Sequence, residues 1–409
     1  MLKTELYEIA AHRGFYGGTP SGLFGIKDNV RKYWEDTFIK LSLRAAVEQI
    51  LAQKGKIRIL DLGCGSGDGI ELLTHIPTAN PFEAAHKDFV LTPLEIDFYK
   101  GLDISATMLA QGQRNYPNLA HIRFEAADLA AGLPCAADEP YDLYFSSYCA
   151  LSPLTCQELE ALTQAIFAHA GARGYLVFDL HGRYSPEWPQ YWEKNCQTQS
   201  PYNTAYLLPP SEQTPEQIQW FDVTYWNDAE LIQMIGRAAR ATRRSAQILA
   251  LQDRSILIGR HMETTLFKSE RQQFRQQVNR LFDHDHRGEI NVLNVDLDYL
   301  EDVKSIQPQA WHRIMEYRQQ WQTVVMMLQA LMTNHNANVK KLIETSPNAL
   351  TEELKMLAWL YRNADRFPVP DFWASVIGPQ VACVLRNLEL NLPMGLGCGH
   401  SLFCLVEIR

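Results

Sequence analysis

The sequence predicts an α/β protein built on a doubly wound, mostly parallel sheet, with a mainly helical domain toward the C-terminus. Strand-length apolar segments alternate with helical patterns from residue 56 to about residue 260, as is typical of a parallel sheet covered by helices. Beyond that region, Gln, Leu, Met and Arg recur at helical spacing. With 409 residues the chain is long enough for more than one domain. We expect an N-terminal arm over residues 1–55, a sheet domain over 56–265 and a helical accessory domain over 266–409.

The strongest local signal is a glycine-rich turn directly after a strand. Residues 57–62 form a mostly apolar run that fits a strand buried on both faces, and Gly63, Gly65 and Gly67 follow without a gap. Helical spacing resumes at Ile70. A strand, a tight glycine turn and a helix start form a corner where bare backbone and free N–H groups can bind an anion or a nucleotide.

Further strands and helices alternate along the chain. Two apolar segments, 246–251 and 255–259, are separated by a short turn and predict an antiparallel hairpin, and residues 402–408 predict a last strand. The other expected strands cover residues 98–104, 122–126, 141–146 and 175–180, and the clearest helices cover residues 29–51 and 228–241.

Three acidic residues lie where the carboxyl ends of parallel strands should meet. Asp103 ends the second strand, and a carboxylate there can accept hydrogen bonds from both hydroxyls of a ribose. Asp128 follows the third strand and could accept a hydrogen bond from an adenine amino group, while Asp61 could orient the glycine turn. Each residue alone could be a helix cap or a turn residue. Their common position at the strand ends of one sheet favours a nucleoside site.

Four motifs in this order resemble those of class I S-adenosylmethionine-dependent methyltransferases over residues 56–260. They start at Asp61 (DLGCGSG), Gly101 (GLDISATML), Ala127 (ADL) and Tyr141 (YDLYFSS). The resemblance implies a Rossmann-like sheet of seven strands, in the order 3-2-1-4-5-7-6 with an antiparallel last strand. It also implies S-adenosylmethionine as the cofactor and methyl transfer as the activity.

The resemblance further implies roles for particular residues. Asp103 would bind the ribose, and Asp128 together with Leu129 would bind the adenine. The other cofactor-binding residues it implies are Gly63, Gly65 and Gly67 under the methionine portion, Ile104 and Met108 in the motif of Asp103, Asp61 in the first motif, and Ser146 beside the methyl-transfer site.

Three other functions are alternatives to methyl transfer to a small molecule. A dinucleotide-dependent oxidoreductase needs glycine at the sixth position of G-x-G-x-x-G, where this chain has Asp68. A non-catalytic cofactor-binding scaffold, with the helical domain holding a protein partner, stays open as an alternative. An RNA methyltransferase is disfavoured, because a net charge of -9 opposes binding to phosphates. We therefore expect a small-molecule acceptor and no nucleic-acid partner.

The acceptor side of the site is predicted from residues after the fourth and fifth strands. A hydroxyl acceptor usually needs a base, and His181 and Tyr148 are the candidate catalytic residues, although His181 could merely bond to loop backbone. Residues 184–226 are rich in Trp and Tyr and could cover a ring-containing or apolar molecule. We expect Tyr184 and Trp188 to bind this acceptor, and one of its oxygen or nitrogen atoms to receive the methyl group.

The N-terminal arm could take part in the same site. A glycine-rich loop at residues 14–22 precedes the aromatic helix at 29–51. This combination suits a lid that closes over a ligand, with Tyr16 and Tyr33 as substrate-binding residues. The alternative is a helix packed at the edge of the domain.

Composition restricts compartment, metal content and partners. The N-terminus lacks the apolar core of a signal peptide and no stretch has the length of a membrane span, so we expect a cytoplasmic protein without membrane contact. The eight cysteines lack a Cys-x-x-Cys pair, which suits buried thiols. Cys398, His400 and Cys404 are close in sequence but are expected to pack in the core, and we predict no metal site. The helical domain could cover the acceptor pocket or form a homodimer interface.

Overall fold

The computed structural model describes residues 28–79, 88–117, 119–268, 271–283 and 286–409. The predicted loop at residues 14–22, with Tyr16, lies outside these ranges. In the described part of the chain, none of the helices combines the length and the apolarity needed to cross a bilayer.

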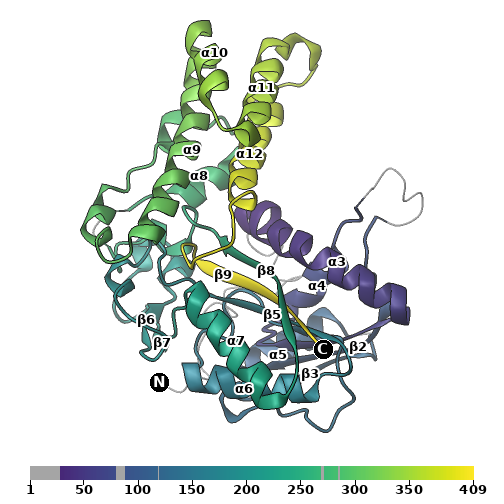
Figure 1. Ribbon diagram of the computed structural model, residues 1–409. Helices are drawn as coiled ribbons and strands as arrows, with labels where there is room; N and C mark the ends of the chain where they lie inside the picture. The colour runs from purple at the N-terminus through teal and green to yellow at the C-terminus, as the bar shows by residue number, and fades with distance from the viewer. Residues whose placement is uncertain (1–27, 80–87, 118, 269–270, 284–285) are drawn as a thin grey trace.

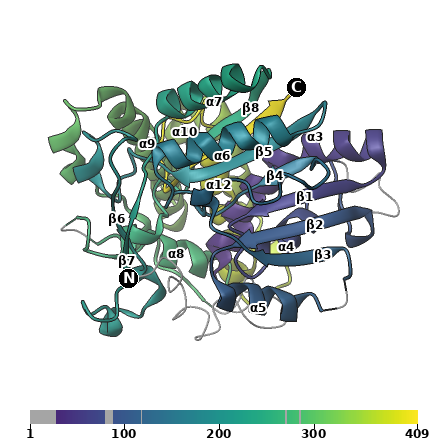
Figure 2. The same ribbon diagram turned by 90° about the horizontal axis from the view of Figure 1, so that it is seen from below.

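Seven strands form one sheet in the order β3-β2-β1-β4-β5-β9-β8 (Figure 2). The strands from β3 to β5 pair in parallel, and β9 is antiparallel to both β5 and β8. Because β8 and β9 occupy the places of the sixth and seventh strands, the expected order 3-2-1-4-5-7-6 is confirmed, and the chain has the class I methyltransferase fold. The strands are β1 (Ile57–Leu62), β2 (Ile96–Asp103), β3 (Ile122–Ala126), β4 (Leu143–Phe145), β5 (Gly174–His181), β8 (Ala246–Arg254) and β9 (Ser401–Ile408).

The predicted hairpin at residues 246–259 is wrong. Its first half is β8, but the partner of β8 is β9, which comes almost 150 residues later in the chain. The second half turns away from the sheet, because the N–H groups of Ser255 and Ile256 donate to the buried carboxylate of Glu389 at 2.8 and 3.0 Å. A side chain from a distant helix therefore takes the hydrogen bonds that a neighbouring strand would have used.

Helices cover both faces of the sheet (Figure 2). Side chains alternate along β1, so that Ile59 packs in the core beneath α3 and α4, whereas Leu60 packs in the core beneath α6 and α7. This two-sided burial explains why β1 is almost continuously apolar. The helices around the sheet are α3 (Asp36–Lys54), α4 (Asp68–Thr74), α5 (Ala106–Asn115), α6 (Cys156–His169) and α7 (Asp228–Thr242). A short π-helix, η2 (Arg31–Glu35), leads into α3.

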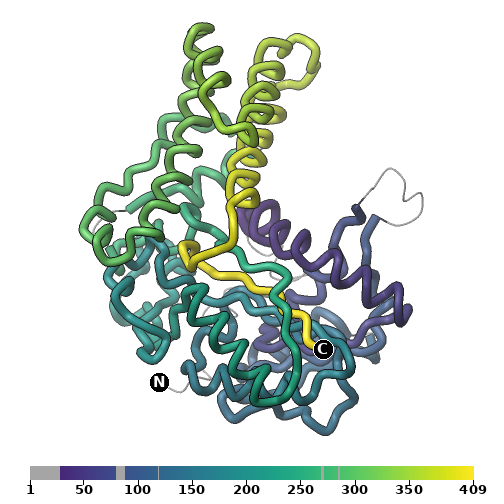
Figure 3. The backbone as a smooth tube through the Cα atoms, viewed as in Figure 1, coloured from purple at the N-terminus to yellow at the C-terminus, as the bar shows by residue number. Residues whose placement is uncertain are grey.

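Between β8 and β9 the chain forms a helical arm, defined here as α9 to α12, which projects away from the sheet (Figure 1). Its apolar core extends to Trp34 and Ile256 in the sheet part of the molecule. Figure 3 shows the chain returning from α12 into β9. The sheet thus contains residues from both sides of position 265, and the division into domains there stays a prediction. The helices of this part are α8 (Phe274–Leu281), α9 (Pro308–Met332), α10 (Asn336–Thr345), α11 (Asn348–Arg362) and α12 (Gly378–Leu390).

The aromatic segment after β5 folds as a compact layer beside the sheet. It contains a small antiparallel pair, β6 (Ser200–Asn203) and β7 (Trp220–Val223). Trp188 and Tyr202 form a buried cluster there with Tyr225 and Phe267. The layer is thereby fixed against the ends of β5 and β9.

Candidate functional site

The glycine turn after β1 uses backbone conformations that glycine adopts more easily than other residues. Gly63, Gly65 and Gly67 have φ values of +75°, +54° and +89°, which side-chain-bearing residues rarely adopt. The N–H groups of Gly63 and Cys64 donate to the carbonyl of Leu102 at 2.8 and 3.0 Å, which ties the turn to the end of β2. The turn therefore presents bare backbone at the carboxyl edge of the sheet.

Asp103 joins the end of β2 to this turn. Its carboxylate accepts hydrogen bonds from the N–H of Gly65 at 2.9 Å and from the N–H of Ser105 at 2.8 Å. Burial raises the pKa of Asp103, although these N–H groups favour the charged form. Each oxygen keeps a lone pair for a further donor, so the side chain can hold the turn and still accept hydrogen bonds from a ligand.

Asp61 lies at the carboxyl end of β1, inside the sheet. The hydroxyl of Tyr99 donates to its carboxylate at 2.5 Å. Burial raises the pKa of Asp61 to about 7, and the hydrogen bond from Tyr99 only partly offsets this effect. A Cβ on Gly69 would come within 2.1 Å of this carboxylate, so the start of α4 needs glycine at that position.

One cavity lies at this edge of the sheet, and its wall has two parts. The turn side, as we call the part formed by residues after β1, β2 and β3, contains most of the predicted cofactor-binding residues. These are Asp61, Gly63, Gly65, Asp103, Ile104, Met108, Asp128 and Leu129. Two others are not in the wall: Gly67 packs against Tyr116 and Phe124, and Ser146 is fully buried.

A second part of the wall, called here the arginine side, includes Arg31, Tyr148, Tyr206 and Arg260. The guanidinium of Arg31 lies 4.3 Å from the centre of the Tyr148 ring and that of Arg260 lies 5.7 Å from it. The hydroxyl of Tyr148 donates to Asp36, and burial raises the pKa of Asp36 to about 7. A hydroxyl paired with such a carboxyl group can pass a proton near neutral pH.

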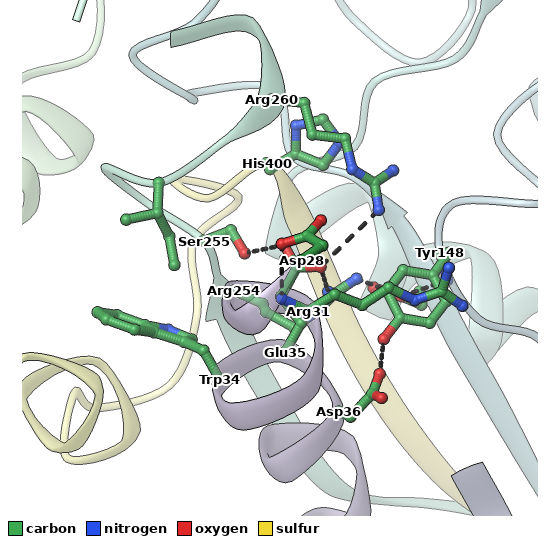
Figure 4. Close-up of polar contacts among 12 residues, drawn as sticks. Asp28, Arg31, Trp34, Glu35, Asp36, Tyr148, Arg254, Ser255, Arg260 and His400 are labelled. Atoms are coloured by element: carbon green, nitrogen blue, oxygen red, sulfur yellow. Dashed lines mark hydrogen bonds and ion pairs between the residues drawn. The ribbon is translucent and has the colours of Figure 1, made fainter. Parts of the chain in front are cut away.

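Glu35 forms buried ion pairs with arginines next to the cavity (Figure 4). Its buried carboxylate lies 2.8 Å from a guanidinium nitrogen of Arg275, 3.4 Å from Arg254 and 3.8 Å from Arg260. The hydroxyl of Ser255 donates to it at 2.7 Å. Burial opposes ionisation of Glu35, but the arginines outweigh burial and hold its pKa well below the ordinary value.

His181 lies at the end of β5 but is not part of the cavity wall. Its ring stacks at 4.3 Å from that of Tyr202 and contacts the rings of Trp188 and His400. Burial, with the neighbouring His400, holds its pKa well below the ordinary value. His181 is therefore neutral and enclosed by aromatic rings.

The predicted substrate-binding residues that the structure describes lie away from the cavity wall. Trp188 is buried and donates to the carbonyl of Gly182 at 2.8 Å, and the hydroxyl of Tyr184 accepts from Asn227 at 2.8 Å. Tyr33 stacks on Phe282 with 4.7 Å between ring centres. Tyr16 lies outside the described residues.

No protein-family model and no curated protein matches this sequence. Several solved structures that it resembles are named as methyltransferases. One is an S-adenosylmethionine-dependent methyltransferase from Clostridium acetobutylicum, 14% identical, with 52% of this chain and 82% of that chain covered and a TM-score of 0.33. Another is magnesium protoporphyrin IX methyltransferase from Synechocystis, 16% identical, with 61% and 89% covered and a TM-score of 0.33. At these sequence identities and TM-scores the matches carry no further argument, and the fold is assigned from the strand order.

Several residues of the site were not predicted from the sequence, among them Arg31, Glu35, Asp36, Tyr206 and Arg260. Arg31 and Glu35 are ordinary charged positions of a predicted helix. Tyr206 lies within the predicted aromatic segment, so its composition was a partial signal. Arg260 follows the supposed hairpin, and only the departure of residues 255–259 from the sheet brings it to the cavity.

Proposed function

We propose that this protein binds S-adenosylmethionine and transfers its methyl group to an oxygen or nitrogen atom of a small, ring-containing molecule. The observation that carries the proposal is a single cavity with two chemically different sides. The turn side has the glycine backbone and the carboxylates that a nucleoside with an amino-acid tail requires. The arginine side provides aromatic rings and cationic groups for a second molecule.

The residues of the turn side fit this cofactor. Gly63 and Gly65 present bare backbone to the cavity, and Asp103 keeps lone pairs for ribose hydroxyls. Asp128 and Leu129 lie in the same wall, where the adenine would bind. The bound cofactor would supply an electrophilic methyl group, and the protein would align the acceptor with it and exclude water.

The acceptor would bind against the arginine side. The rings of Tyr148 and Tyr206 can contact a ring of the acceptor. Arg260 favours an acceptor with a carboxylate or another anionic group, whereas the guanidinium of Arg31 already pairs with Asp68 at 2.6 Å. Tyr148 is the better placed of the two predicted catalytic residues. Its oxygen would take the proton of the acceptor while its own proton passes to Asp36.

Asp103→Ala tests cofactor binding. Removing two charge-assisted hydrogen bonds of about 1.5–3 kcal/mol each should weaken binding of S-adenosylmethionine by roughly 10²–10⁴-fold in calorimetry. The matched control is Asp97→Asn at the other end of β2, where the side chain is half-exposed and only faces Arg58 at 3.5 Å. Wild-type protein that takes up no S-adenosylmethionine would refute the proposal.

Turnover tests the transfer step. With an anionic aromatic acceptor, Tyr148→Phe should lower kcat by roughly 10²–10⁴-fold while cofactor affinity stays within about twofold. His181→Ala in parallel separates the two catalytic candidates. Tight cofactor binding without turnover on a broad set of acceptors would instead support the cofactor-binding scaffold.

Compartment and partners follow from the same chemistry. All eight cysteines are free thiols, which supports a reducing compartment such as the cytoplasm. The net charge of -9 supports a small-molecule acceptor over a nucleic acid.

A further inference from the structure

Cys149, His181 and His400 meet behind the cavity wall. A potential ligand atom of each lies within 4.8 Å of those of the other two, and all three side chains are buried. They come from distant parts of the sequence: the turn after β4, the end of β5 and the residue before β9. The pairing of His181 with Ser401 across β5 and β9 brings the two histidines together.

The Nδ1 atom of each imidazole ring lies beside a hydrogen-bond acceptor. The Nδ1 atom of His400 lies 2.7 Å from the carboxylate of Glu187, and the Nδ1 atom of His181 lies 3.3 Å from the backbone carbonyl of His400. A carbonyl and a carboxylate only accept, so both Nδ1 atoms carry the hydrogen and both Nε2 atoms keep a lone pair. Metal-binding histidines usually donate their second ring nitrogen to such groups.

The Nε2 atom of His400 is the independent observation that points to a ligand. It is buried, and among the described residues it has no hydrogen-bond partner. Only 3% of the residue is exposed to solvent, so bulk water does not satisfy this nitrogen. Buried polar atoms are nearly always paired, and an exception calls for an explanation such as a bound ion.

The backbone conformation at Cys149 also supports a bound ligand. Tyr148 and Cys149 are consecutive residues with φ values of +54° and +61°, a conformation that is uncommon outside glycine and concentrates at functional sites. The N–H of Tyr148 donates to Asp179 at 2.6 Å and holds the turn in place. Tyr148 thereby lines the cavity, while Cys149 lies with the two histidines.

We propose that Cys149, His181 and His400 bind a zinc ion, with Glu187 orienting His400. One thiolate and two imidazoles are a ligand set that favours zinc, and three protein ligands leave a fourth position for water or another small ligand. The surrounding charges are mixed, since Asp179 and Glu35 face Arg254 and Arg260. His181 would then be a metal ligand and not a base. The inference is independent of the proposed function, because metal binding needs neither cofactor nor acceptor.

Cobalt titration of the metal-free full-length chain tests the site. We expect one Co²⁺ per chain, with a thiolate-to-metal charge-transfer absorption and the visible bands of a tetrahedral site. Cys149→Ser should abolish the charge-transfer band, and His400→Gln should weaken binding at least 100-fold. Glu187→Gln should weaken it by about 10–100-fold, as is usual when the partner of a ligating histidine is lost. Cys404→Ala, which changes a buried cysteine facing the core under α6 and α7, should leave the titration unchanged.

Zinc X-ray absorption on the wild-type chain keeps the proposal testable if a variant fails to fold. The expected first shell has one sulfur near 2.3 Å and two or more nitrogen or oxygen atoms near 2.0–2.1 Å, as in other sites of this type. A wild-type chain that binds no Zn²⁺ or Co²⁺, a shell without sulfur, or a charge-transfer band that survives Cys149→Ser would overturn the proposal.

Discussion

The turn side and the arginine side of the cavity are built in different ways. On the turn side, each residue stands within a few positions of the end of β1, β2 or β3, and parallel strands bring those ends together. On the arginine side, Arg31, Tyr148, Tyr206 and Arg260 come from four segments spread over 230 residues. Arg260 lies 3.8 Å from the buried carboxylate of Glu35, and no local sequence pattern predicts this ion pair.

This difference indicates which mutations should affect ligand binding alone and which should also affect folding. A change on the turn side alters backbone or a carboxylate that contacts the ligand directly. A change of Glu35 removes one of the counter-charges of buried guanidinium groups, so it should affect folding as well as binding.

Glu35→Ala is expected to have the largest effect on stability. It leaves Arg254 and Arg275 buried without this partner, and breaking a buried ion pair in this way costs about 3–5 kcal/mol. Urea denaturation measures this cost. Glu301→Ala removes an exposed carboxylate paired with Lys304 and should cost less than about 1 kcal/mol. Equal costs for the two variants would contradict the role given to Glu35.

Gly63→Ala should come next. A Cβ there would lie 2.6 Å from that of Ala150, and the φ of +75° is unfavourable for alanine. Together these effects should cost about 2–4 kcal/mol. Gly55 is the matched control, since its φ is +73° and a Cβ would meet nothing within 4 Å. Gly55→Ala should therefore cost only about 1–2 kcal/mol, and thermal unfolding compares the two.

A smaller effect is expected in the pH dependence of cofactor binding. Because burial raises the pKa of Asp61 to about 7, the free protein carries this carboxyl group protonated at pH 6 and ionised at pH 8. A cationic sulfonium ligand favours the ionised form, so its affinity should rise with pH across this window, by at most about tenfold per unit. Calorimetry from pH 6 to 8 measures the rise. Asp61→Asn should reduce the rise, leaving only the contribution of Asp36, whose pKa is also about 7. An unchanged rise in this variant would exclude Asp61 as its source.

The smallest effect is expected for Tyr33→Ala. Tyr33 was predicted to bind substrate, but the residue is 41% exposed and its ring stacks on Phe282. The substitution should cost about 1 kcal/mol of stability and leave KM for the acceptor unchanged. Steady-state kinetics beside Tyr148→Phe checks this. A several-fold rise in KM would restore the lid hypothesis for the N-terminal arm.

The strands of the sheet were largely predictable because two-sided burial makes each of them a short apolar run. Residues 57–62 and 122–126 were predicted with the bounds that the structure has. The hairpin was predicted wrongly because the identity of the next strand depends on which apolar segment pairs, and β9 is separated from β8 by the helical arm. The sequence of residues 246–259 does not indicate which segment pairs with β8.

The glycine turn, the carboxylates at 103 and 128 and the type of sheet can be predicted from the sequence, because each arises from neighbouring residues in one strand–turn–helix unit. The ion pairs of Glu35 with arginines, the burial of Trp188 in a core, and the meeting of Cys149, His181 and His400 are seen only in the folded chain. The ion pairs of Glu35 and the cluster of Cys149, His181 and His400 join residues more than 30 and up to 251 positions apart. Local periodicity carries no information about such pairs, whereas the pairing of strands and the burial of charge do.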